Sequence, residues 1–508
     1  MVPLIIGTSA YIIAGILSLT YSRRKFWFSL LGWTGGLAGL VTGVLIYGRV
    51  GSLVSSLGRW GALGVEIRLD ETTLLFVALI VVLNFFTLTY LKGRRDGTFY
   101  CLYNFFLAAS YSVAFSNDLF NLYVTIELMS LISILLIGYD RKPYQIYAGI
   151  KYLLISSLSM SLYFIGLSFV YGAGGHLGIQ ELVEKLGGKT SLGLSVGLGL
   201  MLTGLAVKGG VFLFSMWLPD AYSYSGTVVS VLLAGIGTKA GIIGIIRMTA
   251  LTGWTNLLLG LGAMTGILGA ALAVVNRRPK RILAFSSISQ VGYILIAVGI
   301  GTPAGLVVAS LYIFFHGLFK SLLFLSVGYA GVGSEDTSLD RVNAVPIASK
   351  VGIVVGSLSI MAIPPFNGYF VKSLLLESAG YEWVQWSILV IGFGTVIYSL
   401  DLIRSFLIDP SAGNFGIRSF SVLGFSGTVA LSTVSVWFIF GRGPMLNLLI
   451  PYHVLVSFGL FAAGGLVYLG LRSQLEKYEF PAFPFDLDNS LISLFTGLLV
   501  VVSGMLLI

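Results

Sequence analysis

Several ionisable residues of this chain fall inside long apolar stretches of sequence. They are Glu127, Lys208, Lys239, His316, Lys320 and Lys372. A charged group at the centre of a bilayer costs roughly 2.5–3.5 kcal/mol even on the mildest insertion scale. Because that cost would recur at several positions, we expect these residues to have a use beyond packing.

Buried lysine is suited to stepwise proton transfer. Apolar surroundings lower the pKa of an amine, and an adjacent carboxylate raises it again. A Glu–Lys contact that forms and breaks would therefore switch the proton affinity of the lysine, whereas an arginine stays charged. Glu127 lies mid-span, and Lys208 is its nearest candidate partner in the sequence. His316 and Lys320 stand four residues apart, so they share one face of a helix.

A structural interpretation competes with this one, because a single buried charge can tie two helices together or reach an interface. We assign such a role to Lys151, about one turn inside its apolar segment, and to Arg247, near the outer end of its own. Both side chains are long enough to place their charge in the interface. Glu377, five residues after Lys372, is left open as a local partner or an outer-end residue.

Two of the lysines stand beside interruptions in their segments. Lys208 is followed at once by Gly209–Gly210, and Lys372 follows Pro364–Pro365 and Gly368. Gly and Pro are common in membrane helices. Broken helices at corresponding positions of two halves are nevertheless a good pointer to an ion path. The combination of breaks and buried lysines predicts discontinuous helices at a functional site.

The elements that position these residues are membrane helices. Of the 508 residues 56% are hydrophobic and 10% are charged, whereas soluble domains carry roughly 25% charged residues. The apolar runs are continuous rather than alternating, which favours helices over a closed barrel. We predict one all-α transmembrane domain over residues 1–508. Its sixteen apolar segments are residues 2–20, 26–48, 72–92, 98–116, 118–138, 145–172, 191–217, 226–250, 254–275, 282–300, 304–330, 347–379, 382–406, 418–440, 452–471 and 489–508.

The net charge of +9 does not indicate nucleic-acid binding, because the basic residues lie mainly in short loops. Loops numbered in order carry 18 Lys and Arg residues when odd and 6 when even. Positively charged loops stay on the cytoplasmic side of a membrane. We therefore expect a multi-pass protein of the cell membrane with both termini outside.

Cysteine and histidine are too sparse for a redox centre made by this chain. Cys101 is the single cysteine, and the three histidines are far apart. Clusters and zinc sites ligated by several cysteines, and a haem held by two histidines, are thus not expected. We expect no cofactor, no metal and no redox catalysis by the chain alone.

Five stretches together resemble a known family. They are SNDLFNLYVTIELMSL, AVKGGVFLFSMWLPDAYSYSGTVVSVLLAGIGTKAG, KRILAFSSISQVGY, HGLFKSLLFLSVG and IPPFNGYFVKS. In this order, from about Asn117 to Ser373, they are similar to motifs of the antiporter-like subunits of respiratory Complex I and of Mrp cation/proton antiporters. The sequence DLFNLYVTIE is most similar to the corresponding motif of the D-type subunit of Mrp antiporters and of its counterparts in membrane-bound hydrogenases and sulfane reductases.

The resemblance implies fourteen core helices, hence about 14–16 in this chain, with two inverted five-helix repeats that each contain a broken helix. The repeats would span approximately residues 98–250 and 254–406, followed by C-terminal helices over 407–508. Two departures stand out. Gln290 occupies a position that is histidine in many relatives, which leaves a polar relay there open, and Arg278–Pro279 replaces an acidic-led turn.

The resemblance also implies roles for the residues that match its motifs. Glu127 and Lys208 would form a gating pair, and Lys239 would be a central relay. His316 and Lys320 would form the next relay, and Lys372 would exchange the proton at the end of the path.

We therefore expect a proton or sodium/proton path in a subunit of a larger membrane complex. It would be coupled to redox chemistry in other subunits or to a cation gradient. The alternative is an autonomous solute transporter, whose broken helices would surround a roomy cavity for a small anion or amino acid. A string of lysines with one mid-span acid favours the ion path. The ion, the host complex and the direction of transport stay open.

Overall fold

The protein is a multi-pass membrane protein built almost wholly of helices. The computed structural model describes residues 1–58, 64–186, 191–331, 345–408, 416–440, 451–477 and 487–506. Within these ranges twelve helices are long and apolar enough to cross a bilayer. The predicted all-α membrane fold is confirmed.

The chain forms two compact units. The first comprises Met1–Ala221, Ile236–Leu257 and Phe485–Ile508, and the second comprises Tyr222–Gly235 and Leu258–Pro484. Three elements run from one unit into the other: α9 (Leu218–Tyr224), a π-helical turn at Leu233–Gly237, and α12 (Thr255–Val275).

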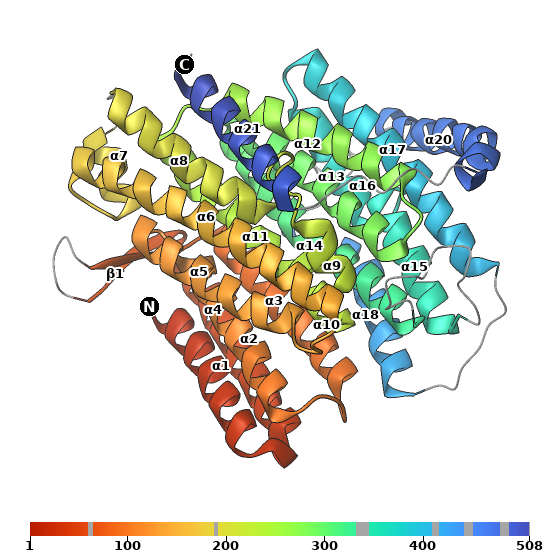
Figure 1. Cartoon of the computed structure of the whole chain (residues 1–508), viewed down its shortest axis with the longest axis horizontal. Helices are drawn as coiled ribbons and strands as arrows, with labels where there is room; N and C mark the ends of the chain where they lie inside the picture. The colour runs from red at the N-terminus through yellow and green to blue at the C-terminus, as the bar shows by residue number, and fades with distance from the viewer. Residues whose placement is uncertain are drawn as a thin grey trace. The chain divides into compact units, whose positions relative to one another are not determined.

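The first unit is a bundle of long helices with a small hairpin. In α1 (Val2–Thr20), α2 (Lys25–Val50), α4 (Gly97–Phe115), α6 (Pro143–Gly174) and α8 (Leu192–Gly209), neighbours pack along much of their length. Figure 1 shows α1 beside α2 and α6 beside α8. The remaining helices of this unit are the short 3-10 turn η1 (Ser22–Arg24), α3 (Glu71–Leu91), α5 (Leu119–Ile137), α7 (Ile179–Leu186), α11 (Thr238–Met248), the 3-10 turn η4 (Thr249–Leu251) and α21 (Leu487–Leu506).

The second unit centres on two deeply buried helices. The candidate span of α13 (Pro279–Gly299) is wholly buried, and α14 (Pro303–Tyr329) is largely so. Its other helices are α10 (Thr227–Leu232), α15 (Ile347–Ile360), α16 (Asn367–Ser378), α17 (Glu382–Leu407), α18 (Ile417–Phe440) and α20 (Pro451–Lys477). The burial of α13 and α14 places their polar side chains inside protein rather than against lipid.

Short polar side chains precede several of the helices. Asp70, Asp96 and Asp118 precede α3, α4 and α5, and each carboxylate accepts a hydrogen bond from the backbone N–H three residues later. Such caps satisfy amide groups that the first helical turn leaves unpaired. Aspartate at the ends of apolar runs therefore fixes where these helices start.

A two-stranded hairpin precedes α3. Strand β1 (Leu53–Leu57) pairs antiparallel with β2 (Val65–Leu69), and Leu53 lies opposite Leu69. The backbone N–H of Asn117 also bonds to the carbonyl of Glu66 at 3.1 Å. The hairpin thereby reaches the start of α5 and holds Asp70 in place.

The sequence segments differ from the observed spans at four places. Three of the predicted segments form helices that are not among the twelve spans. Segment 98–116 forms α4, segment 418–440 forms α18 and segment 489–508 forms α21. Segment 347–379 divides into α15 and α16, each too short to cross a bilayer alone. The predicted discontinuity near Pro364–Pro365 is therefore present.

Candidate functional site

Glu127 and Lys208 meet inside the first unit, as their positions in the sequence suggested. The Lys208 Nζ lies 3.3 Å from the Glu127 Oε2 and 2.6 Å from the Ser130 Oγ. It also donates a hydrogen bond to the Ser156 hydroxyl. The lysine side chain is 2% exposed and the glutamate side chain 22%. The carboxylate therefore lies nearer the surface of the unit than the amine it contacts.

The end of α8 positions this amine. The helix stops at Gly209, directly after Lys208, and Gly210 adopts a left-handed backbone conformation with φ +70°. The Val207 carbonyl accepts from the Trp217 Nε1 at 2.9 Å and from the Gly210 N–H at 3.2 Å. Helix α11 approaches closely because Gly241 has no Cβ, and a Cβ there would collide with the backbone of Gly209. The predicted break at Gly209–Gly210 is confirmed.

A second buried ion pair lies in the same unit. The Lys151 Nζ is 2.7 Å from the Asp220 Oδ2, and the two side chains are 1% and 5% exposed. The ring of the next residue, Tyr152, is tilted by 34° against that of Trp217 with 4.4 Å between the centroids. The Lys208 Nζ lies 5.8 Å from the Tyr152 ring centroid. The expectation that Lys151 reaches the interface is wrong, because Asp220 lies past the α8 break and neutralises its charge inside the protein.

Lys239 lies on the first turn of α11, directly after the π-helical turn. Its side chain is fully buried, and its Nζ is 3.5 Å from the Thr238 hydroxyl. π-Helical turns inside α-helices are frequent at functional sites. The turn widens the backbone spiral immediately before the buried amine.

His316 and Lys320 lie on one face of α14 in the second unit, and both are fully buried. The Lys320 Nζ donates to the hydroxyl of Ser286 on α13. The His316 ring centroid is 5.5 Å from that of Phe319 and 6.4 Å from that of Tyr312. The predicted shared face is present.

A row of side chains leads from His316 toward Lys372. Tyr312 stacks on Tyr293 with centroids 5.5 Å apart, and the Lys372 Nζ lies 4.6 Å from the Tyr293 centroid. The Tyr312 hydroxyl donates to the Gln290 Oε1 at 2.7 Å. Gln290, whose role the sequence left open, is thus part of this buried row.

Lys372 lies on α16, just after the interruption that separates this helix from α15. Its residue exposure is 8%, and its Nζ donates to the Ile360 carbonyl at 2.6 Å. That carbonyl belongs to the last residue of α15. The break therefore frees a backbone acceptor that the amine uses. Glu377 is exposed on the same helix.

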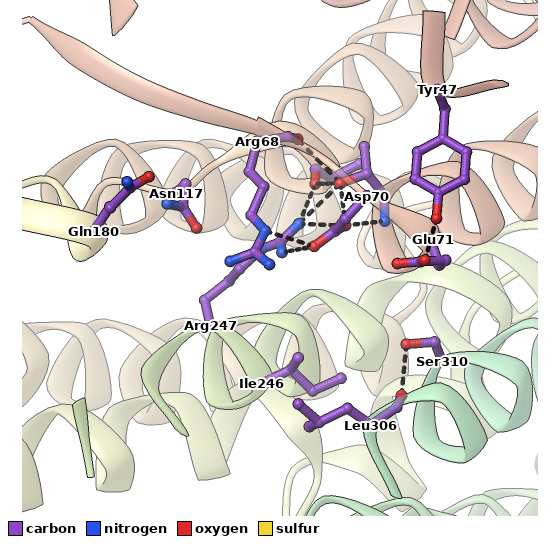
Figure 2. Close-up of polar contacts among 12 residues, drawn as sticks. Tyr47, Arg68, Asp70, Glu71, Asn117, Gln180, Ile246, Arg247, Leu306 and Ser310 are labelled. Carbon is purple, nitrogen blue, oxygen red and sulfur yellow. Dashed lines mark hydrogen bonds and ion pairs between the residues drawn. The ribbon is translucent and has the colours of Figure 1, made fainter. Parts of the chain in front are cut away.

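Arg247 is buried and forms polar contacts with Asp70, as Figure 2 shows. It is 4% exposed and pairs with Asp70, its Nη2 lying 3.1 Å from the Asp70 Oδ1 and 2.9 Å from the Thr73 hydroxyl. Arg68 Nε also lies 2.9 Å from the Asp70 Oδ2. The sequence did not predict this partner, a carboxylate that the hairpin brings to the arginine.

The Asp70 carboxyl stays charged in this cluster. Burial by itself would raise its pKa, but the adjacent Arg247 charge and the hydrogen bonds from Arg247 and Thr73 outweigh burial and lower it. Since arginine also stays charged, the pair is a permanent anchor for α11, which carries Lys239 two turns earlier.

Sequence reasoning also missed Lys280. The count of basic loop residues treats Lys280 as part of a loop. In the structure α13 begins at Pro279, and Lys280 is buried in it with 5% exposure. Its Nζ donates to the Ser225 carbonyl at 2.9 Å. A proline at the first helical position was the available signal, because it marks helix starts.

Metal binding finds no support in the part of the chain that the structure describes. Within those ranges no group of three or more His, Cys, Asp or Glu side chains is arranged to hold a metal ion.

Comparison with known sequences identifies related proteins. Residues 116–398 match the family described as NADH:quinone oxidoreductase/Mrp antiporter, TM. The D-type subunit of the Na(+)/H(+) antiporter of Alkalihalophilus pseudofirmus is 31% identical over 396 residues, covering 75% of this chain and 79% of the relative. The N-type subunit of the NADH-quinone oxidoreductase of Desulforudis audaxviator is 33% identical over 372 residues, covering 67% and 72%.

Two solved structures share the fold. One is a chain of the membrane-bound sulfane sulfur reductase, an archaeal respiratory membrane complex, with a TM-score of 0.79. The other is a chain of the Mrp complex from Dietzia sp. DQ12-45-1b, with a TM-score of 0.77. Each is 20% identical and covers 92% of this chain and 98% of the other. At that identity the likeness concerns the fold alone.

Proposed function

This chain belongs to the NADH:quinone oxidoreductase/Mrp antiporter family, and we propose that, as an ion-translocating subunit of a larger membrane complex, it moves protons between its buried lysines. The observation that carries the proposal is the Glu127–Lys208 contact at the end of a broken helix. It joins a buried amine, a partly exposed carboxylate and two serine hydroxyls at one point.

In the first unit Glu127 acts as the gate. While its carboxylate contacts the Lys208 amine, the charged ammonium form is favoured. When Glu127 turns toward the surface, the amine remains among apolar groups and hydroxyls, where the neutral form is favoured. The proton then leaves, and Lys239 on the neighbouring α11 is the proposed receiver.

In the second unit the proposed path follows the buried row. Lys320 and His316 receive the proton, and Tyr312, Tyr293 and Gln290 line the way to Lys372. Imidazole and amine groups can both gain and lose a proton in such surroundings. Lys372 then exchanges the proton with the aqueous phase at the break between α15 and α16.

The remaining parts of the proposal follow from family membership and from the loop charges. The transported ion is a proton, with sodium as a second ion in an antiport cycle. The two interrupted regions belong to two inverted repeats, near residues 98–250 and 254–406, and both termini lie outside the cell. The driving force comes from a redox module in other subunits or from a cation gradient.

The autonomous solute transporter is not favoured. The similar proteins are subunits of antiporters and of respiratory enzymes. Both solved structures that share the fold are of complexes.

The test is proton movement in vesicles that contain the assembled host complex. We expect Glu127→Gln to slow coupled proton movement, because it removes the switching charge. Lys208→Ala should abolish it, because it removes the proton carrier. Lys185→Ala, on the exposed face of α7, is the control and should transport normally. Normal transport by both Glu127→Gln and Lys208→Ala in assembled complexes would overturn the proposal.

A further inference from the structure

A cavity of the second unit contains Lys372 and a histidine that no step above uses. Its polar lining comes from Tyr293, Lys372, Ser373, His453 and Ser457, and its other lining residues are apolar apart from backbone. The room it offers to the centres of water molecules is about 40 Å³, and the cavity is open on one side. Helices α13, α16, α17 and α20 contribute, together with the residues that follow α15.

The Lys372 amine faces this cavity without a negative partner. It contacts the Ile360 carbonyl at 2.6 Å and the Tyr293 ring at 4.6 Å. Among the described residues no carboxylate lines the cavity, and none forms an ion pair with Lys372. A proton released here therefore has no carboxylate to receive it.

His453 is the other residue of the lining whose side chain has a nitrogen that can accept and release a proton. It is the third residue of α20, and its Nδ1 is buried without a hydrogen-bond partner among the described residues. Its ring contacts Tyr452, with centroids 5.3 Å apart. Buried polar atoms of this kind are normally satisfied by protein or by ordered water.

The other polar groups of the cavity are poor proton carriers. The Tyr293 hydroxyl already donates to the Ile388 carbonyl at 3.2 Å. Ser373 and Ser457 carry hydroxyls, which do not titrate in the physiological range but can orient water. Among the lining groups only the Lys372 amine and the imidazole gain and lose protons easily.

We propose that His453 exchanges protons with Lys372 through water in this cavity, so that α20 supplies a surface-side member of the path. The Lys372 ammonium gives one proton to water, and water gives one to the neutral imidazole, which leaves a neutral amine and an imidazolium. The imidazolium then returns its proton to water at the mouth of the cavity. This inference rests on the proposed function, because it requires that Lys372 release a proton.

Two substitutions of nearly equal size separate a proton carrier from a packing residue. Glutamate at position 453 can carry a proton and glutamine cannot, although both are polar and similar in shape. In vesicles with the assembled complex, we expect His453→Gln to lower the rate of proton movement at least about tenfold, within the range of general acid–base effects. His453→Glu should retain transport with its optimum displaced to lower pH.

The control is His176→Gln, which changes a histidine that pairs with Glu181 outside the membrane spans and should transport normally. Equal behaviour of the Gln and Glu variants, whether both normal or both impaired, would overturn the role of His453. The proposed function is tested apart from it, because normal transport by both Glu127→Gln and Lys208→Ala would overturn that function whatever the histidine variants do.

Discussion

Lys151 on α6 and Asp220 beyond the end of α8 form an ion pair that is almost completely removed from water, with 2.7 Å between Nζ and Oδ2. Both charges lose their hydration in this position, so each depends on the other for compensation. The pair joins α6 to the segment that follows the α8 break. It therefore fixes the geometry around Lys208, whose amine lies above the adjacent Tyr152 ring.

We expect Asp220→Ala to destabilise the protein by about 3–5 kcal/mol, because it leaves the Lys151 charge buried and unpaired. The double substitution Lys151→Met/Asp220→Leu should cost clearly less, since it removes both charges and keeps apolar volume. Thermal unfolding of the purified complex in detergent measures both effects. A double variant no more stable than Asp220→Ala would show that the unpaired Lys151 charge is not the cause of the loss.

Acid should weaken the anchor between Asp70 and Arg247. The folded-state pKa of Asp70 lies below its ordinary value, so the stabilisation is present above the unfolded-state pKa of about 3.9 and is lost as pH falls through the folded-state value. We therefore expect the melting temperature of the complex to fall as the pH is lowered from about 3.9 toward the folded-state pKa of Asp70. Asp70→Asn should be less stable near pH 7 and should show a smaller acid-induced decrease.

The control for this experiment is Asp140→Asn, which removes a carboxylate that pairs with Arg95 at a more exposed position. Exposed ion pairs contribute little to stability, so this variant should melt near the wild-type temperature at pH 7. A wild-type acid profile in Asp70→Asn would mean that other carboxylates dominate the acid response.

Sequence alone could locate the buried lysines and both helix breaks, because a charge or a glycine pair stands out within an apolar run. It could also pair Glu127 with Lys208, since few other charges were available. It could not find partners for Lys151 or Arg247, which are 69 and 177 residues from Asp220 and Asp70. Whether such long side chains reach an interface or turn inward depends on packing that local pattern does not encode.

The cavity at Lys372 was beyond the sequence for a related reason. His453 is 81 positions away in the chain and lies on a helix whose outer face is largely exposed. Only the packing of α20 against α17 brings this histidine to the same cavity as the lysine. Hydropathy marks α20 as a span, but it does not say which of its faces meets protein.

Lys372 provides the sharpest test of proton transfer against permanent charge. Its amine holds the Ile360 carbonyl and lies over the Tyr293 ring, and an arginine can make contacts of both kinds. If the lysine is a structural tie, Lys372→Arg should therefore transport nearly as well as the wild type. A proton carrier must become neutral in each cycle, which the guanidinium cannot do.

We expect both Lys372→Arg and Lys372→Ala to abolish coupled transport in assembled complexes, measured as the pH gradient or membrane potential of reconstituted vesicles. Lys185→Arg on exposed α7 controls for the exchange of one cation for the other. Near-wild-type pumping by Lys372→Arg would make this lysine structural, and the exit of the path would then have to lie elsewhere in the chain.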